Sequence, residues 1–187
     1  MSDDPQKELL VSLQTALVNF DGLKVAALIE QGLRVRRTYV DASKYRNALH
    51  ELVLNYTSYA PSERPPKLHI KFIDIMTLLK DNGLDVNEHD IKHLTVLHHA
   101  CSSANNRDII RALIDAGVRV NQPDLGQQTA LHRAVLTGCQ EDVRSLLEGK
   151  ADPNLLDNMG FSALHLAVKR TLCTLLESQY LFKCFSN

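Results

Sequence analysis

The sequence predicts an all-α repeat solenoid, in which pairs of helices stack side by side, and three observations support this prediction. A hexapeptide of the form Thr/Ser-x-Leu-His-x-Ala occurs at residues 95–100, 129–134 and 162–167, and its copies begin 34 and 33 residues apart. Between the copies, apolar residues recur at helical spacing. Glycines follow several of these apolar segments, where a helix would end.

Length and composition are those of one ordinary folded domain. The 187 residues fit about five units of this period, and 44% of them are apolar while 23% are charged. A net charge of −1 argues against a chain dedicated to wrapping nucleic acid or coating acidic membranes. The local exception is a basic cluster: Arg34, Arg36, Arg37, Lys44 and Arg46.

Cysteine spacing and the first residues favour a reducing compartment. The cysteines at 101, 139, 173 and 184 form no C-x-x-C pair, and we expect them to be reduced, buried thiols. The chain opens with Met-Ser-Asp-Asp-Pro-Gln, without the basic and apolar regions of a secretory signal, and no apolar run reaches the length of a membrane span. These features favour the cytoplasm and allow the nucleus as well.

The first unit, residues 6–35, is predicted to cap the array. Residues 6–19 place apolar side chains at helical spacing, Asp21-Gly22 interrupts the pattern, and a second apolar face ends at Gly32. Its first helix lacks the hexapeptide. Terminal repeats are atypical because one of their faces meets water instead of a neighbouring repeat.

The second unit, residues 45–88, has a degraded hexapeptide, Asn-Ala-Leu-His-Glu-Leu at 47–52, and an insertion. Gly83 follows Asn47 by 36 positions, whereas Gly117 follows Thr95 by 22, so about 14 residues are added. We place them at 57–71, where a Pro-rich polar stretch would form an exposed loop. Long loops in compact repeats are often binding or regulatory elements, although tolerated surface length is the plainer interpretation.

The third and fourth units are predicted at residues 90–122 and 124–155. Gly117 ends the third unit with a residue suited to the left-handed helix cap, whereas Lys150 holds that register in the fourth unit and Gly149 precedes it. Between the two helices of the third unit, residues 102–106 replace the tight turn that Gly138 supplies in the fourth.

The fifth unit, residues 157–187, begins like the others and ends differently. After Arg170 the chain has no glycine turn, and its last 17 residues are rich in apolar and aromatic side chains. A capping helix would have a polar outer face. This tail therefore indicates an altered or truncated end, with either a longer form that continues the array or a tail that packs against a partner or against the chain itself.

The hexapeptide resembles the Thr-Pro-Leu-His-x-Ala signature of the ankyrin-repeat family, which opens the first helix of each unit of about 33 residues. The resemblance implies one domain, 1–187, of helix pairs joined by short β-hairpin tips. The resemblance also implies that the Thr caps the helix and that the His hydrogen-bonds to the backbone across the unit. The hexapeptide residues expected in the packed interior are Leu97, Leu131, Leu164, Ala100, Ala134 and Ala167.

The resemblance also implies where a partner binds, since partners of such proteins usually meet the concave face formed by hairpin tips and first helices. The matching tip positions are Ile91, Lys92, His93, Leu125, Gln127 and Met159. On the first helices, the variable fifth position of the hexapeptide is His99, Arg133 and Leu166. This mixture of charged, imidazole and aliphatic groups suits a protein partner better than DNA.

Catalysis, cofactors and metals find little support in the sequence. There is no G-x-S-x-G, no phosphate-binding glycine loop and no H-E-x-x-H motif. Eight histidines raise a zinc hypothesis, but His98 shares the repeated position of His132 and His165, while His89 and His93 flank a tip. We therefore expect no catalytic residue, no cofactor and no metal.

Asn87 and Asn121 follow Asp-Val and Arg-Val in two tips, and these hairpins resemble those that an asparaginyl hydroxylase modifies in this family. The alternative is an unmodified turn asparagine that bonds its own backbone.

Taken together, we expect a non-enzymatic scaffold or adaptor that binds a protein through the concave face, with no nucleic-acid, membrane or metal partner. The alternative is a regulatory inhibitor of an enzyme or transcription factor that acts through the 57–71 loop. A metal-dependent role is the third hypothesis.

Overall fold

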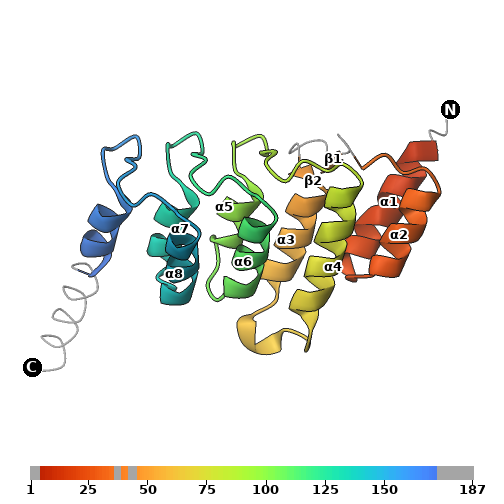
Figure 1. Ribbon diagram of the computed structural model, residues 1–187, viewed down its shortest axis with the longest axis horizontal. Helices are drawn as coiled ribbons and strands as arrows, with labels where there is room; N and C mark the ends of the chain where they lie inside the picture. The colour runs from red at the N-terminus through yellow and green to blue at the C-terminus, as the bar shows by residue number, and fades with distance from the viewer. Residues whose placement is uncertain (1–4, 36–38, 42–45, 172–187) are drawn as a thin grey trace, which may run out of the picture.

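The computed structural model describes residues 5–35, 39–41 and 46–171, and their helices stand side by side in a row (Figure 1). The α-helices are α1 (Pro5–Val18), α2 (Gly22–Glu30), α3 (Ala48–Ser58), α4 (Leu68–Asp81), α5 (Val96–Ala100), α6 (Arg107–Asp115), α7 (Ala130–Thr137) and α8 (Gln140–Glu148). Residues 163–171 are also helical, and Pro61–Glu63 form a 3₁₀ helix, η1. The prediction of an all-α repeat fold is confirmed.

The connections between successive pairs form tips along one edge of the stack (Figure 1). Strands β1 (Tyr39–Asp41) and β2 (Arg46–Asn47) pair antiparallel in the first of them. Two later tips close with a single antiparallel bridge, His89 to Thr95 and Leu156 to Ser162. These tips are therefore narrow turns rather than extended hairpins.

The hexapeptide caps its own helix and bonds the next unit. At the start of α5 the Thr95 backbone N–H donates to His98 Nδ1 at 3.1 Å, and the hydroxyl of Thr95 lies 2.8 Å from the same nitrogen. His98 Nε2 lies 2.9 Å from the carbonyl oxygen of Gln128, in the following tip. A carbonyl can only accept, so Nε2 carries the proton and the ring is the neutral Nε2–H tautomer. Burial lowers the pKa of His98 in agreement.

The same arrangement recurs one unit later, where Thr129 caps α7 with His132, and His132 Nε2 lies 3.1 Å from the Phe161 carbonyl oxygen. Leu97 and Leu131 are buried, as predicted, and so are Ala100 and Ala134. The structural roles expected for these hexapeptide residues are confirmed.

Leu164 contradicts the prediction that it belongs to the interior, because its side chain is 69% exposed. Leu131, its equivalent on α7, is only 2% exposed, and α7 packs against α8, the second helix of its pair. Within the described residues, no second helix follows the 163–171 helix. Burial of this leucine thus depends on a neighbouring helix that the hexapeptide itself does not supply.

The insertion in the second unit is partly helical, which corrects the loop predicted at 57–71. Helix α3 continues to Ser58 and α4 begins at Leu68, so the pair is longer than its neighbours and its loop projects from the edge opposite the tips (Figure 1). Leu68 and Phe72 are buried, and this burial explains why the helix begins before the predicted end of the loop. Arg64 fixes the loop to the next pair, donating to the Asn105 carbonyl at 2.5 Å and to Asn106 Oδ1 at 2.6 Å.

Lys150 and Asn105 adopt the left-handed conformation at two positions where other units of the repeat have glycine. Lys150 adopts the left-handed conformation, with φ of 66°, in the glycine register after α8. The preceding Gly149 is needed for space, since a Cβ there would lie 2.6 Å from Ile114 Cδ1. Asn105, with φ of 62°, supplies the left-handed residue between α5 and α6 that Gly138 supplies between α7 and α8.

Several predictions concern residues outside the described parts of the chain. These are the basic residues Arg36, Arg37 and Lys44, and the tail from residue 172 with its cysteines at 173 and 184. The other two cysteines, Cys101 and Cys139, are buried free thiols. Burial also raises the pKa of the Cys101 thiol, which keeps it protonated and unreactive.

Candidate protein-binding surface

An aspartate holds each of the last three tips in one conformation. One carboxylate oxygen of Asp90 accepts the backbone N–H groups of Lys92 and Leu94, at 2.8 and 2.9 Å. Asp124 and Asp157 repeat this geometry, accepting from backbone two and four residues further on, at 2.8 to 2.9 Å. Although burial opposes it, the hydrogen bonds from Leu94 and Lys92 lower the pKa of Asp90. The tips are therefore rigid at neutral pH.

These rigid turns present apolar side chains to solvent. Ile91 is 54% exposed, Leu125 62% and Met159 76%, and each lies one or two residues after the tip aspartate. We call Ile91, Leu125 and Met159 the tip row. Lys92, His93 and Gln127, the other predicted tip contacts, are exposed beside it. Exposed apolar groups repeated along one edge of a soluble protein are typical of an interaction surface.

Two of the three predicted first-helix contacts are turned back onto the tips. His99 Nε2 lies 3.1 Å from Asp90 Oδ2, and an Arg133 Nη lies 2.8 Å from Asp124 Oδ2. In both cases the aspartate precedes its partner by nine residues. These side chains fix the angle between each tip and its helix. They keep only a limited exposed area for a partner, 12% of the His99 side chain and 27% of the Arg133 side chain.

Leu166 holds the same position in the fifth unit and does not lie on the surface, since it is only 7% exposed. An aliphatic side chain cannot pair with Asp157, nine residues earlier, and it packs inward where a charged one would remain at the surface. The prediction that Leu166 is a partner contact therefore conflicts with the burial of its side chain. Asp157 is instead approached by Gln128, whose Nε2 lies 3.4 Å from Oδ2.

A second histidine stands against His99. The ring of His50 lies 5.7 Å from that of His99, and His50 Nδ1 lies 2.7 Å from Asn47 Oδ1. Burial, with the neighbouring His99 second, lowers the pKa of His50 to about 4. Burial likewise lowers the pKa of His99. Both rings are neutral at pH 7, so neither adds a positive charge behind the Asp90 tip.

Among the described residues, no three His, Cys, Asp or Glu side chains are grouped closely enough to hold a metal ion. His89 and His93 stack face to face, with ring centroids 4.1 Å apart.

The two asparagines singled out in the sequence link neighbouring units. Asn87 Oδ1 accepts the backbone N–H of Arg119 at 2.7 Å, and Asn121 Oδ1 accepts that of Asp152 at 2.8 Å. Asn121 also donates to the Lys150 carbonyl at 3.2 Å. Their hydroxylation stays a prediction, and their side chains already have a structural role.

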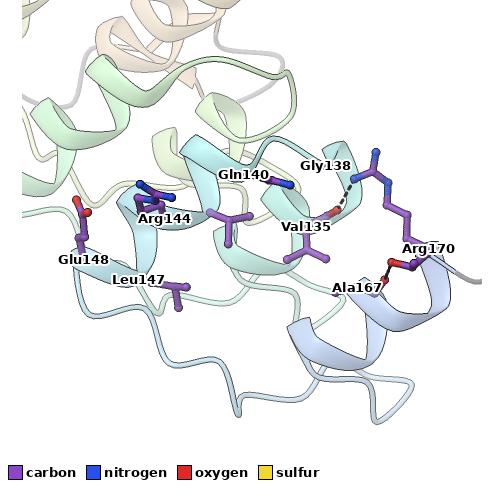
Figure 2. Close-up of a pocket in the computed structure, with 10 residues that line it drawn as sticks. Val135, Gly138, Gln140, Arg144, Leu147, Glu148, Ala167 and Arg170 are labelled. Carbon is purple, nitrogen blue, oxygen red and sulfur yellow. Dashed lines mark hydrogen bonds between the residues drawn. The ribbon is translucent and has the colours of Figure 1, made fainter.

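Sequence reasoning did not find a groove at the end of the described stack (Figure 2). It has a volume of about 580 Å³ and lies between α7, α8 and the 163–171 helix. Its apolar lining comprises Val135, Val143, Leu147 and Ala167, with Arg144 and Arg170 among its polar lining. The missing glycine turn after Arg170 was the sequence signal that could have indicated it.

The geometry defines the class of protein: a solenoid of stacked helix pairs whose tips lie along one edge. Residues 69–157 match the family model for ankyrin repeats, in three copies. Residues 69–157 therefore carry ankyrin repeats, and the resemblance of the hexapeptide to that family is confirmed. A comparison with curated proteins found no match. Within the described residues, no helix combines the length and apolar character needed to cross a membrane.

Proposed function

We propose that this chain is a non-enzymatic scaffold or adaptor that binds a protein partner across its tips and the adjoining first helices. Ankyrin repeats generally mediate protein–protein interaction. The observation that carries the proposal is the tip row, three exposed apolar side chains on turns that aspartates hold rigid. Rigid contacts lose little conformational freedom on binding, so more of the contact energy becomes affinity.

The composition of the surface defines the partner that fits it. Ile91, Leu125 and Met159 favour an apolar ridge or patch on the partner. Lys92, His93 and Gln127 supply hydrogen bonds at the rim of that contact. His50 and His99, which are neutral at pH 7, add no positive charge for a nucleic-acid backbone.

The experiment compares affinity capture from native lysate by the wild-type chain and by a triple variant, Ile91→Asp, Leu125→Asp and Met159→Asp. The variant should lose the partners that the wild type captures and keep the wild-type melting temperature, because all three side chains are exposed. The control is Ile70→Asp, which replaces an exposed apolar side chain with one negative charge at the start of α4, at the opposite edge of the stack. Unchanged capture by the triple variant would exclude the tip row.

A regulatory inhibitor acting through the inserted loop is the second candidate. Its support is the anchor formed by Arg64, whose guanidinium also lies 4.7 Å from the ring centroid of Tyr56, so that the loop is a preformed projection. Replacing residues 60–66 with a short Gly-Ser linker should then remove inhibition of the captured enzyme or transcription factor while the stack stays folded. Full inhibition by that variant would reject this role.

We also propose that the protein works in the cytoplasm or nucleus and that Asn87 and Asn121 are acceptors for hydroxylation. The buried free thiols Cys101 and Cys139 support a reducing compartment. Peptide mass spectrometry of protein from its native cell tests the modification. Absence of a peptide heavier by one oxygen atom would remove it.

A further inference from the structure

The groove at the end of the stack lies where a second helix of the fifth unit would pack. We call the groove lined by Val135, Val143, Leu147 and Arg144 the seat. Leu147 on its wall is 46% exposed, whereas Ile114, its equivalent on α6 one unit earlier, is partly buried where α6 packs against α8. Arg170 forms the other wall and donates to the Val135 carbonyl at 3.3 Å (Figure 2). An apolar wall of this kind is stabilised by covering it.

The interface between α6 and α8, one unit earlier, shows which charged residues pair across such a groove. Arg107 and Arg111 of α6 form ion pairs with Glu141 and Glu148 of α8. The residue one repeat after Arg111 is Arg144, which lines the groove. None of the ion pairs among the described residues involves Arg144. The seat therefore offers an arginine where the equivalent arginine of α6 binds a glutamate.

The sequence that follows the described helix has the side chains to fill this seat. Residues 110–115 of α6 read Ile-Arg-Ala-Leu-Ile-Asp, and residues 143–148 of α8 read Val-Arg-Ser-Leu-Leu-Glu. Residues 172–177 read Leu-Cys-Thr-Leu-Leu-Glu. We call 172–177 the tail motif. It repeats the apolar positions of α8 and places Glu177 in the register of Glu148, the partner of Arg111.

The spacing prevents the tail motif from occupying the seat of its own chain in that register. Val143 follows Leu131 by 12 positions, whereas Leu172 follows Leu164 by 8. Gly138, with φ of 78°, ends α7, but its equivalent Thr171 is still helical. An antiparallel return needs a turn of about two to five residues. Here the helix would have to unwind to supply that turn.

We propose that the groove binds the tail motif of a second copy of this chain, and that two chains exchange these segments. A connection too short to fold back favours such an exchange, because the same contacts form between chains without unwinding a helix. The apolar residues of the motif cover Val143 and Leu147, and Glu177 of the second copy pairs with Arg144. This surface is separate from the tip row, so the dimer leaves the proposed partner face free.

The mass of the 187-residue chain in solution, by light scattering after size exclusion, tests the exchange. The wild type should have twice the chain mass at micromolar concentration, and Leu147→Asp or Leu176→Asp should reduce it to one. Leu125→Asp, an exposed leucine on a tip, is the matched control and should remain dimeric. Arg144→Glu and Glu177→Arg should each weaken the dimer at least tenfold, and the double variant should recover it.

A second variant tests the shortened connection directly. Inserting Gly-Ser-Gln-Glu between Arg170 and Thr171 restores the 12-residue spacing of the fourth unit, so the motif should return to its own groove and the protein should become monomeric. A monomeric wild type would overturn the proposal. If hydrogen exchange in that monomer showed a protected tail motif, the occupant would be the chain's own tail.

Discussion

The middle of the stack and its last described helix carry the same hexapeptide in different surroundings. His132 bonds its own Thr129 and also reaches the Phe161 carbonyl of the next unit. His165 keeps the first contact, with Ser162 Oγ 2.9 Å from its Nδ1, but within the described residues its Nε2 bonds no carbonyl. Leu131 is buried while Leu164 is exposed. The hexapeptide thus caps its helix alone, whereas its packing requires a neighbour, as expected for a nearly one-dimensional array.

The largest expected difference in the free energy of unfolding is between variants of Leu131 and Leu164. Leu131→Ala leaves a cavity between packed pairs and should lower the free energy of unfolding by about 2 to 5 kcal/mol. Leu164→Ala removes an exposed side chain and should cost less than about 0.5 kcal/mol. Urea unfolding followed by circular dichroism measures both. Equal losses would contradict the dependence of packing on a neighbour.

Variants of His132 and His165 should give the next largest difference in the free energy of unfolding. His132→Ala removes a helix cap and leaves the Phe161 carbonyl without its donor, for a loss of about 2 to 3 kcal/mol. His165→Ala removes only the cap contact and should cost about 1 kcal/mol. Chemical unfolding under one set of conditions compares them. A His165 variant as unstable as the His132 variant would mean that another group holds the ring.

Acid should destabilise the region around His50 and His99. The pKa of His50 is near 6.5 in the unfolded chain and about 4 when folded, so the unfolded state binds more protons between these values. Stability is complete above pH 6.5 and falls with pH, by about 2 kcal/mol from His50 alone at pH 5. The low pKa of Asp90 adds a loss only below about pH 4.

His50→Gln tests that assignment. The variant should be less stable at pH 7 but should lose less stability between pH 7 and pH 5 than the wild type does. Unfolding midpoints at several pH values provide the comparison. An unchanged slope in the variant would assign the acid sensitivity to other groups.

The smallest expected effects concern the end of α8. Lys150→Gly removes the strain of a left-handed lysine and should stabilise the protein by about 0.5 to 1 kcal/mol. Gly149→Ala should destabilise it, because the added Cβ meets Ile114. Thermal unfolding of both variants checks the signs. A less stable Lys150→Gly variant together with a more stable Gly149→Ala variant would contradict the roles assigned to these two positions.

Local signals made the fold predictable, and contacts with distant residues produced the errors. The hexapeptide predicted that Thr95 and Thr129 cap their helices, because the cap contacts, with His98 and His132, lie within three residues. The 57–71 loop was predicted too long because burial of Leu68 and Phe72 extends α4. Arg64 reaches Asn106, 42 residues away, and no local pattern shows that contact.

The candidate surface was predictable in part. The exposed tip residues follow from their place in the repeat. The nine-residue spacing from Asp90 to His99 and from Asp124 to Arg133 was present in the sequence, and it indicates a pair only once the tip is known to fold back onto its helix. Leu166 breaks that pairing, so extending the row to it from the repeat register alone conflicts with the burial of its side chain.

Hydrogen exchange of the 187-residue chain, with and without its captured partner, tests the central claim most directly. Binding across the tips predicts new protection of backbone N–H groups at residues 90–94, 124–128 and 157–161, with little change at residues 60–66. Protection confined to residues 60–66, with unchanged tips, would contradict the account.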